Sequence, residues 1–379
     1  MHIDDLLKIA AQRGASDLHL KVGSYPMMRI SGTLEVCSEE KRLDKADTEG
    51  MADSLFSPDQ REKFRRVQEV DLAHGIPGVG RFRCNVFQQR GTVGLVLRVI
   101  PTRIKNIDEL GLPPVLKRIA QEERGLVLVT GTTGSGKSTT LAAMIDYINS
   151  TRAAHIMTVE DPIEYLHRDH HSIVNQREVN VDTSSFSHAL RSALRQDPDV
   201  ILVGEMRDHE TVETALLAAE TGHLVFSTLH TLDATETINR IISVFPPHQQ
   251  RQVRIQLSGV LKAAIAQRLL PRADGTGRCP AVEVMIATGF IRDCIIDKDR
   301  TSQIHGAIAA GTSQYGMQTF DQSIFDLYEQ GLVTLDEALR WASNVDEFKL
   351  RVQGISTTAG DAQDEMRTAG TPEITRFGG

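Results

Sequence analysis

Apolar and polar residues recur with two different periods in the first hundred residues. A helical spacing opens the chain, with apolar side chains at Ile3, Leu6, Leu7 and Ala10. Strict alternation then follows at 18–22, 28–30, 34–36, 82–86 and 93–99. Because helices and half-buried strands have these two periods, we expect residues 1–100 to form a small α+β domain. Scattered glycine and proline residues predict a linker over 101–114.

From about Val115 the pattern changes to short, continuous apolar runs separated by helical segments. The runs lie at 126–130, 155–159, 200–203 and 224–228. This alternation is typical of an α/β fold with a mostly parallel sheet. We expect that core to cover 115–272 and a helical region to cover 273–353. The last stretch, 354–379, is rich in Thr, Gly, Ala and acid, which predicts a disordered tail.

A phosphate-binding motif lies between the first of these runs and a predicted helix. Residues 131–139 read G-T-T-G-S-G-K-S-T and match G-x-x-x-x-G-K-[ST] at every position. Small residues let backbone N–H groups surround a phosphate chain, and the helix N-terminus adds a positive dipole end. A plain glycine turn would not explain the Lys-Ser pair. We expect ATP to bind Gly131, Thr132, Thr133, Gly134, Ser135, Gly136, Lys137, Ser138 and Thr139.

Hydrolysis also needs acids beside the loop, and two predicted strands end in them. Glu205 follows the run 200–203 after one glycine, as in a Walker B strand. Glu160 ends the run 155–159, with Glu164 one helical turn further. We expect Mg²⁺ to be held by the Ser138 hydroxyl and, through water, by Glu205. The sequence leaves open which glutamate is the general base, and an N-cap or a solvated acid is the alternative for each.

Two histidines bracket the run 224–229: His223 before it and His230 after it. A histidine at a strand end can sense the γ-phosphate or cap a turn, and we favour a catalytic role for both. In the first domain, Arg81 and Arg83 share one face of a predicted strand, and Arg98 lies on the polar face of the next. The three arginines form either a solvated face or arginine fingers that reach a neighbouring subunit's nucleotide.

Composition excludes several classes of protein. No apolar run approaches the ~18 residues of a membrane span, and the N-terminus carries acid where a secretory signal carries base, so we expect a cytoplasmic protein. The four cysteines, at 37, 84, 279 and 294, lie far apart without a C-x-x-C pair, which argues against zinc and disulfides. A net charge of −8 and few aromatics disfavour the alternative of a RecA-type nucleic-acid motor. ATP is preferred over GTP because no N-K-x-D motif follows the loop.

These motifs together resemble the type II/IV secretion ATPases, and within them the type IV pilus retraction ATPases (PilT-like). The resemblance covers about residues 1–353. Besides the phosphate loop it includes an acidic box at 158–164, a Walker B box at 199–208, a histidine box at 221–231, and the segments 16–20 and 80–83. It implies a PAS-like N-terminal domain, a RecA-like P-loop core and a homohexameric ring. The implied function is a motor that depolymerises pilin fibres for twitching motility, docked on an inner-membrane platform protein and acting without nucleic acid.

The chain departs from the retraction ATPases in one motif. Those enzymes carry A-I-R-x-L-I-R near the C-terminus, where this chain has Phe290 in place of Ala and Ile296 in place of the last basic residue. A divergent or accessory retraction paralogue is therefore an alternative. A pilus-assembly or type II secretion ATPase is another. Those enzymes usually have an extra N-terminal domain and a tetracysteine insertion. This sequence begins almost directly at the expected α+β domain and has no tetracysteine motif, so we expect retraction. A non-catalytic nucleotide-binding regulator is disfavoured by the full set of acids.

Overall fold

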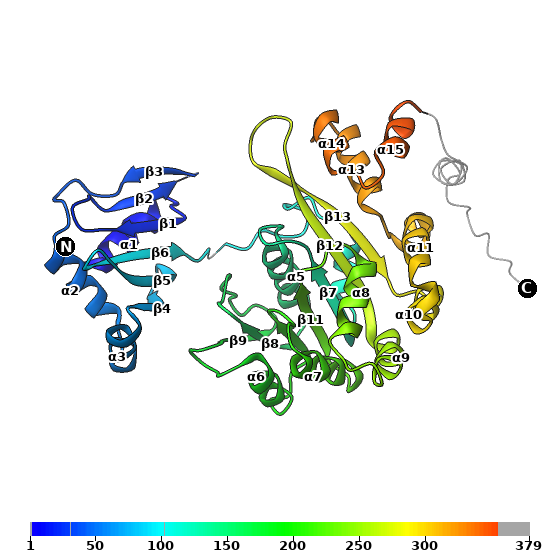
Figure 1. Cartoon of the computed structure of the whole chain (residues 1–379), viewed down its shortest axis with the longest axis horizontal. Coiled ribbons are helices and arrows are strands. Elements are labelled where there is room, and N and C mark those ends of the chain that lie inside the picture. Colours follow the sequence, from blue (N-terminus) through cyan, green and yellow to red (C-terminus); the bar gives the residue numbers. More distant parts are fainter. Residues whose placement is uncertain (1, 31, 102, 355–379) are drawn as a thin grey trace, which may run out of the picture. The chain divides into compact units, whose positions relative to one another are not determined.

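The computed structural model describes residues 2–30, 32–101 and 103–354 (Figure 1). The chain divides into two units, one of residues up to 104 together with 162–167, and the other of the remaining chain. The division falls within the expected linker. The predicted tail lies outside the described residues, apart from Gly354. No helix in the described ranges is both long enough and apolar enough to cross a bilayer.

The first unit is a six-stranded antiparallel sheet in the order β3-β2-β1-β6-β5-β4. Its strands are β1 Asp17–Leu20, β2 Met27–Ile30, β3 Thr33–Val36, β4 Glu69–Ile76, β5 Gly80–Gln89 and β6 Thr92–Val99. Its helices are α1 Ile3–Gln12, α2 Lys45–Leu55 and α3 Pro58–Val67. The four apolar residues of α1 are all buried, and with one face of the sheet they build the core of this unit. The predicted opening helix is confirmed, and the segments of alternating residues form β1, β2, β3, β5 and β6.

The sheet of the second unit has seven strands in the order β13-β12-β7-β11-β10-β8-β9, and all but β13 are parallel. The strands are β7 Gly125–Thr130, β8 His155–Glu160, β9 Ile173–Glu178, β10 Val200–Val203, β11 Leu224–Leu229, β12 Leu261–Pro271 and β13 Arg278–Ile286. The four predicted apolar runs are β7, β8, β10 and β11, and they occupy the middle of the sheet.

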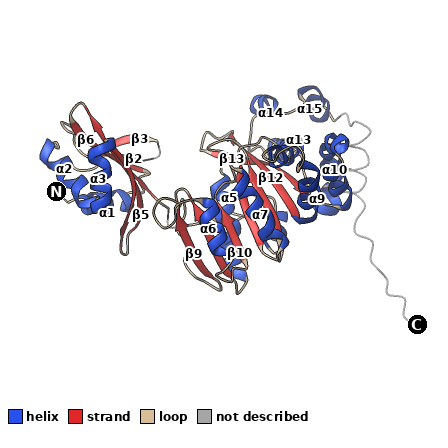
Figure 2. Cartoon of the chain, turned by 60° about the horizontal axis from the view of Figure 1, so that its bottom comes forward, coloured by secondary structure: helices blue, strands red, loops and turns tan. Residues whose placement is uncertain are grey.

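Helices cover both faces of this sheet (Figure 2), which is why the central strands β7, β10 and β11 are buried at every position. Val127 and Val129 of β7 pack with α4 and α5, and Leu126 and Leu128 pack on the opposite face with α7, α8 and α9. The helices of this part are α4 Val115–Ala120, α5 Lys137–Thr151, α6 Phe186–Ala193, α7 His209–Glu220, α8 Ala234–Ser243 and α9 Gln250–Val260.

One boundary in the prediction was wrong. The expected helical region 273–353 begins with β13, which pairs antiparallel with β12 over nine positions and completes the sheet. The sequence of β13 shows little periodicity. This segment is a strand because its backbone pairs with β12. After β13 the chain is helical: α10 Gly289–Ile296, η1 Lys298–Gln303, α11 Ile304–Ala310, α12 Thr312–Tyr315, α13 Phe320–Glu329, α14 Leu335–Trp341 and α15 Val345–Val352.

Candidate active site

The phosphate loop joins the buried strand β7 to the N-terminus of α5, as its motif requires. Gly131 and Gly136 have φ of +141° and +94°, which L side chains rarely adopt. A Cβ at Gly131 would lie 2.4 Å from the backbone oxygen of Gln267, and one at Gly136 would lie 2.7 Å from Gln267 Nε2. Glycine is therefore needed at both positions because the loop lies directly against β12.

Gln267 of β12 is a site residue that the sequence analysis missed. Its side chain is buried, and its Oε1 accepts a hydrogen bond from Thr140 Oγ1 at 2.7 Å. Thr140 belongs to the first turn of α5, so this bond ties the helix behind the loop to the neighbouring strand. The signal in the sequence was a polar residue that directly follows the apolar run 263–266.

The loop holds donors ready for an anion. Lys137 Nζ donates to the backbone oxygens of Gly131 and Thr132, both at 2.9 Å, and the side chain is 9% exposed. Ser135 Oγ is buried without a hydrogen-bond partner among the described residues. Ser138 lies half-buried in the first turn of α5. An ammonium group, an unsatisfied hydroxyl and a helix N-terminus at one place fit a phosphate chain.

The parallel register brings the predicted acids to the edge of the sheet where the loop lies. Val203 of β10 pairs with Val159 of β8 and with Ser227 of β11, and Leu229 of β11 pairs with Thr130 of β7. The strands therefore end together. Glu160 is the last residue of β8, Glu205 follows β10 by two residues, and His230 follows β11 directly. Glu160, Glu205 and His230 therefore lie at the same edge of the sheet as the phosphate loop, and their catalytic roles stay predictions.

Glu205 has basic neighbours in this arrangement. Its Oε2 lies 2.7 Å from Arg207 Nε and 3.7 Å from His230 Nε2. The turn that carries Glu205 is held by its backbone, because Gly204 N–H donates to the oxygen of Val159 and Thr228 Oγ1 donates to the oxygen of Gly204. Arg207, whose side chain is 71% exposed, was not predicted as a site residue. Only its place two residues after a Walker B glutamate could have indicated it.

Glu160 is oriented by two side chains of the sheet. Its Oε1 accepts hydrogen bonds from Thr158 Oγ1 at 2.6 Å and from Gln176 Nε2 of β9 at 3.3 Å. The carboxylate is half-buried at the strand end. Two such bonds fix the direction in which the acid points, and this restricts it to one geometry beside the loop.

The prediction that His223 acts at the same pocket is wrong within this unit. His223 precedes β11, whose first residue Leu224 pairs with Gly125 at the start of β7, so His223 lies at the opposite edge of the sheet. Its Nδ1 lies 2.9 Å from the backbone oxygen of Ala218. The histidine closes the turn between α7 and β11, which is the alternative that the sequence left open.

The predicted arginine face exists in the first unit. Arg83 of β5 and Arg98 of β6 are cross-strand partners, and Arg81 follows on the same face, opposite buried Phe82. Arg98 Nε contacts Asp17 Oδ1 at 3.0 Å, so part of its charge is paired. The role of these arginines as fingers stays a prediction. So does the role of Glu164, which belongs to the segment 162–167 grouped with the first unit.

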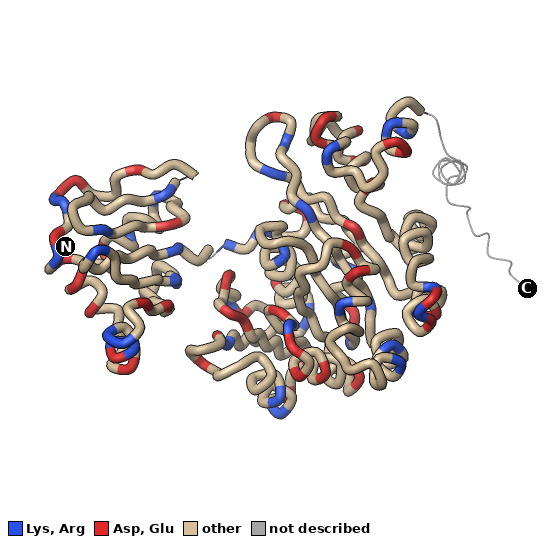
Figure 3. The backbone as a smooth tube through the Cα atoms, in the orientation of Figure 1, with Lys and Arg blue, Asp and Glu red and all other residues tan. Residues whose placement is uncertain are grey.

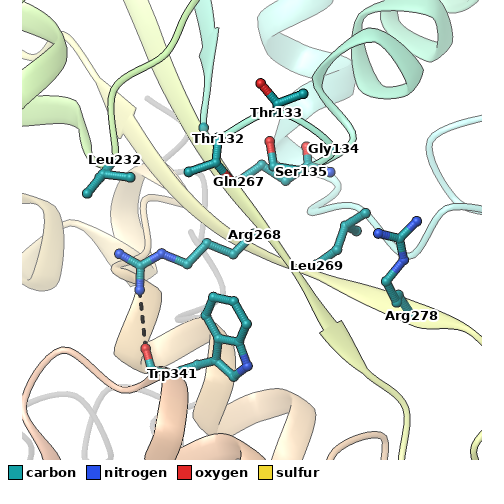
Figure 4. Close-up of a pocket in the computed structure, with 11 residues that line it drawn as sticks. Thr132, Thr133, Gly134, Ser135, Leu232, Gln267, Arg268, Leu269, Arg278 and Trp341 are labelled. Atoms are coloured by element: carbon teal, nitrogen blue, oxygen red, sulfur yellow. Dashed lines mark hydrogen bonds between the residues drawn. The ribbon is translucent and has the colours of Figure 1, made fainter.

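A pocket of about 390 Å³ opens beside the loop (Figure 4). Arg268 crosses it, with Nη1 donating to the backbone oxygen of Trp341 at 3.2 Å and the guanidinium 3.9 Å from the ring centroid of Phe320. The volume is in the usual range for a small-molecule site. The pocket is lined by Gly131, Thr132, Thr133, Gly134, Ser135, Leu232, Gln267, Arg268, Leu269, Arg278 and Trp341.

Comparison with known proteins agrees with this geometry. A family model described as "Type II/IV secretion system protein" matches residues 75–341. The chain is 47% identical to the type IV pilus retraction ATPase PilT of Pseudomonas aeruginosa, over 92% of this chain and 100% of that protein. It is 40% identical to the type IV pilus ATPase PilU of the same organism, over 99% and 97%.

A solved structure of the pilus retraction motor PilT with bound ADP superposes with a TM-score of 0.84. It is 49% identical in sequence and covers 92% of this chain and 98% of that one. The predicted fold, an α/β P-loop core with a smaller α+β domain, is thereby confirmed.

Proposed function

This chain belongs to the type II/IV secretion system protein family, and from that membership we propose that it is an ATPase motor that retracts type IV pili. The observation that carries the proposal is the grouping of a complete phosphate loop with Glu160, Glu205 and His230 at one edge of the sheet. A protein that only bound a nucleotide would have no need of two oriented acids there.

Different residues of the site bind the phosphates, hold the metal ion and activate the attacking water. Lys137 exchanges its two backbone acceptors for the β- and γ-phosphates, which offer full negative charge to the same ammonium group. Mg²⁺ would neutralise charge on those phosphates, and the residues that would hold it are Ser138 and, through water, Glu205. Glu160 and Glu205 are the acids available to orient and deprotonate the attacking water. His230 Nε2 lies 3.7 Å from Glu205 Oε2, so His230 is placed to respond when the Glu205 carboxylate changes its position or its charge.

The nucleoside of ATP fits the pocket beside the loop. Leu232, Leu269 and Trp341 offer apolar surface, and Arg268 and Arg278 add two cationic side chains to the lining. An apolar lining with a few polar groups is what adenine sites need. We place the adenine and ribose here.

The motor acts as a homohexameric ring in this proposal. Arg81, Arg83 and Arg98 would serve as fingers toward a nucleotide, and such a finger is worth roughly 10³–10⁵ in kcat. The ring would work in the cytoplasm against an inner-membrane platform protein and act on the pilin fibre indirectly. Acidic and basic residues are interspersed along the described chain (Figure 3).

One observation favours a second candidate, a divergent retraction paralogue. Phe290 and Ile296, which replace the expected Ala and basic residue, are 47% and 44% exposed. Two apolar side chains on the surface of α10 would give this ring a contact face different from that of other retraction motors. The strong similarity to PilU along the whole chain agrees with this candidate.

Phosphate release by the purified chain tests the enzymatic part. We expect Lys137→Ala to abolish turnover and Glu205→Gln to lower kcat by at least ~100-fold, since each removes a charge that only the reacting triphosphate needs. Lys117→Ala is the matched control, because Lys117 of α4 pairs with the exposed Asp108, outside the pocket and the phosphate loop. Turnover that survives both site variants would remove the active-site assignment.

A further inference from the structure

A buried polar layer lies beneath the phosphate loop and plays no part in the mechanism above. It contains Thr130, Thr231, Thr237 and Glu283, none of them more than 3% exposed. Thr237 Oγ1 donates to the backbone oxygen of Asp233 at 2.7 Å and lies 2.7 Å from Thr231 Oγ1. Glu283 is the only member that can carry a charge, and burying a carboxyl is costly unless it is well bonded.

The sheet register places Glu283 in line with the active site. Glu283 of β13 pairs with Ala266 of β12, Ala266 pairs with Thr130 of β7, and Thr130 pairs with Leu229 of β11. Thr130 is the residue before the phosphate loop, and Leu229 is the residue before His230. Paired residues of one row point to the same face of a sheet, so the carboxyl of Glu283 and the side chain of Thr130 share a face.

The carboxyl of Glu283 reaches the segment that follows His230. Its Oε1 accepts the backbone N–H of Ala234, the first residue of α8, at 2.9 Å. Among the described residues this is the only hydrogen bond that the carboxyl makes. The bond ties the N-terminus of α8 to β13, across β12 from the phosphate loop. The segment held in this way, 230–233, carries His230, which lies near Glu205, and Leu232, which lines the nucleotide pocket.

We propose that Glu283 is a positioning residue for nucleotide turnover, and that it acts by holding segment 230–233 against the phosphate loop. The inference rests on the proposed function, because it assigns Glu283 a part in the same reaction. Among the described residues Glu283 makes no hydrogen bond to the loop and does not line the pocket, so it acts through Ala234 and not on the substrate itself.

The hold depends on the charge of the carboxyl, because an anion bonds a helix N-terminus more strongly than a neutral acid does. Burial raises the pKa of Glu283 to about 7. The charged groups that face it are Asp233 and Asp321, which oppose ionisation, and Arg268 of β12, which favours it. On α11, the remaining helix packed on β13, the titratable residue is His305, which is exposed. The segment is therefore held more firmly above about pH 7 than below it.

The test is the pH dependence of ATP turnover by the full chain, compared between wild type and two variants of Glu283. We expect wild-type kcat to rise as the pH passes through about 7. Glu283→Gln keeps an acceptor for Ala234 but cannot ionise, so its kcat should lack this rise and stay within about threefold of the low-pH wild-type value. Glu283→Ala should lower kcat on the order of 10- to 100-fold, the contribution of a charge-assisted hydrogen bond, with a smaller change in KM.

Ser323→Ala is the matched control. It removes a different buried side-chain acceptor, Ser323 Oγ of α13, which accepts the backbone N–H of Val282 of β13. It should keep the wild-type pH profile. Two results would show that Glu283 is not a positioning residue: a Glu283→Gln pH profile of kcat equal to that of wild type, or loss of the rise in kcat near pH 7 in Ser323→Ala. Neither result would affect the proposal that the chain is an ATPase. A wild-type chain without turnover would overturn both proposals. Because Gln is isosteric with Glu, the test does not depend on the folding of Glu283→Ala.

Discussion

Glu283→Gln should make the protein more stable at high pH, although it removes a hydrogen-bonded charge. A carboxyl whose pKa is raised in the native state favours folding while it is protonated. Its contribution to the free energy of unfolding is complete below the pKa of the unfolded chain and is lost as the pH rises through the native pKa. For Glu283 that window runs from the ordinary value of 4.5 to about 7. Glutamine does not titrate, so its contribution to the free energy of unfolding does not change with pH.

The size of the effect follows from these two values. At ~1.4 kcal/mol per pKa unit, the contribution lost across the window is about 3 kcal/mol. For a folded unit of roughly 250 residues, that corresponds to a change of roughly 6–12 °C in Tm. The quantity to compare is the Tm of Glu283→Gln minus the Tm of wild type at the same pH. We expect this difference to be roughly 6–12 °C larger at pH 8.5 than at pH 5.

Scanning calorimetry of both chains without nucleotide, at equal concentration and ionic strength, measures this difference. Glu213→Gln is the control, because Glu213 lies exposed on α7, and its Tm difference from wild type should not change with pH. A Tm difference for Glu283→Gln that stays constant from pH 5 to pH 8.5 would refute the reasoning, since it would mean that the buried carboxyl titrates as it does in water.

Three further predictions concern the loop, the arginines and the cysteines. Gly131→Ala should weaken the binding of fluorescent ADP far more than Gly134→Ala. The new Cβ at position 131 would lie 2.4 Å from a backbone oxygen of β12, whereas a Cβ at position 134 would meet nothing within 4 Å. Equal affinities of the two variants would contradict the close packing of the loop against β12. Rings mixed from Lys137→Ala and Arg83→Ala subunits should recover part of the ATPase activity if fingers act between subunits, and no recovery at any ratio would exclude this. All four cysteines are free and buried, so a thiol reagent should label the native chain slowly and the denatured chain at four positions; fast native labelling would contradict the fold.

Local patterns predicted most of the elements that position the site. The phosphate loop, the acids Glu160 and Glu205, and His230 were found because each lies at the end of a short, mostly apolar strand, and such strands can be recognised without knowledge of their neighbours. The opening helix and the hairpins of the first unit were found in the same way, from residues whose period matches their burial.

The residues that sequence reasoning missed depend on contacts between distant segments. Gln267 belongs to the site because β12 pairs with β7, and Arg207 because its side chain folds back to Glu205. His223 was wrongly assigned because it precedes β11 whereas the phosphate loop follows β7, and these two strands are parallel, so the two sites lie at opposite edges of the sheet. Strand β13 escaped prediction for a similar reason, since its partner β12 stabilises it and its own periodicity does not.

The central claim is that ATP turnover by this chain shortens pili. The most direct test follows fluorescently labelled pili on live cells in which the native gene carries Lys137→Ala. The account predicts pili that extend and do not shorten, with loss of surface motility. Cells without pili would indicate an assembly motor, and pili that shorten at the wild-type rate would contradict the account.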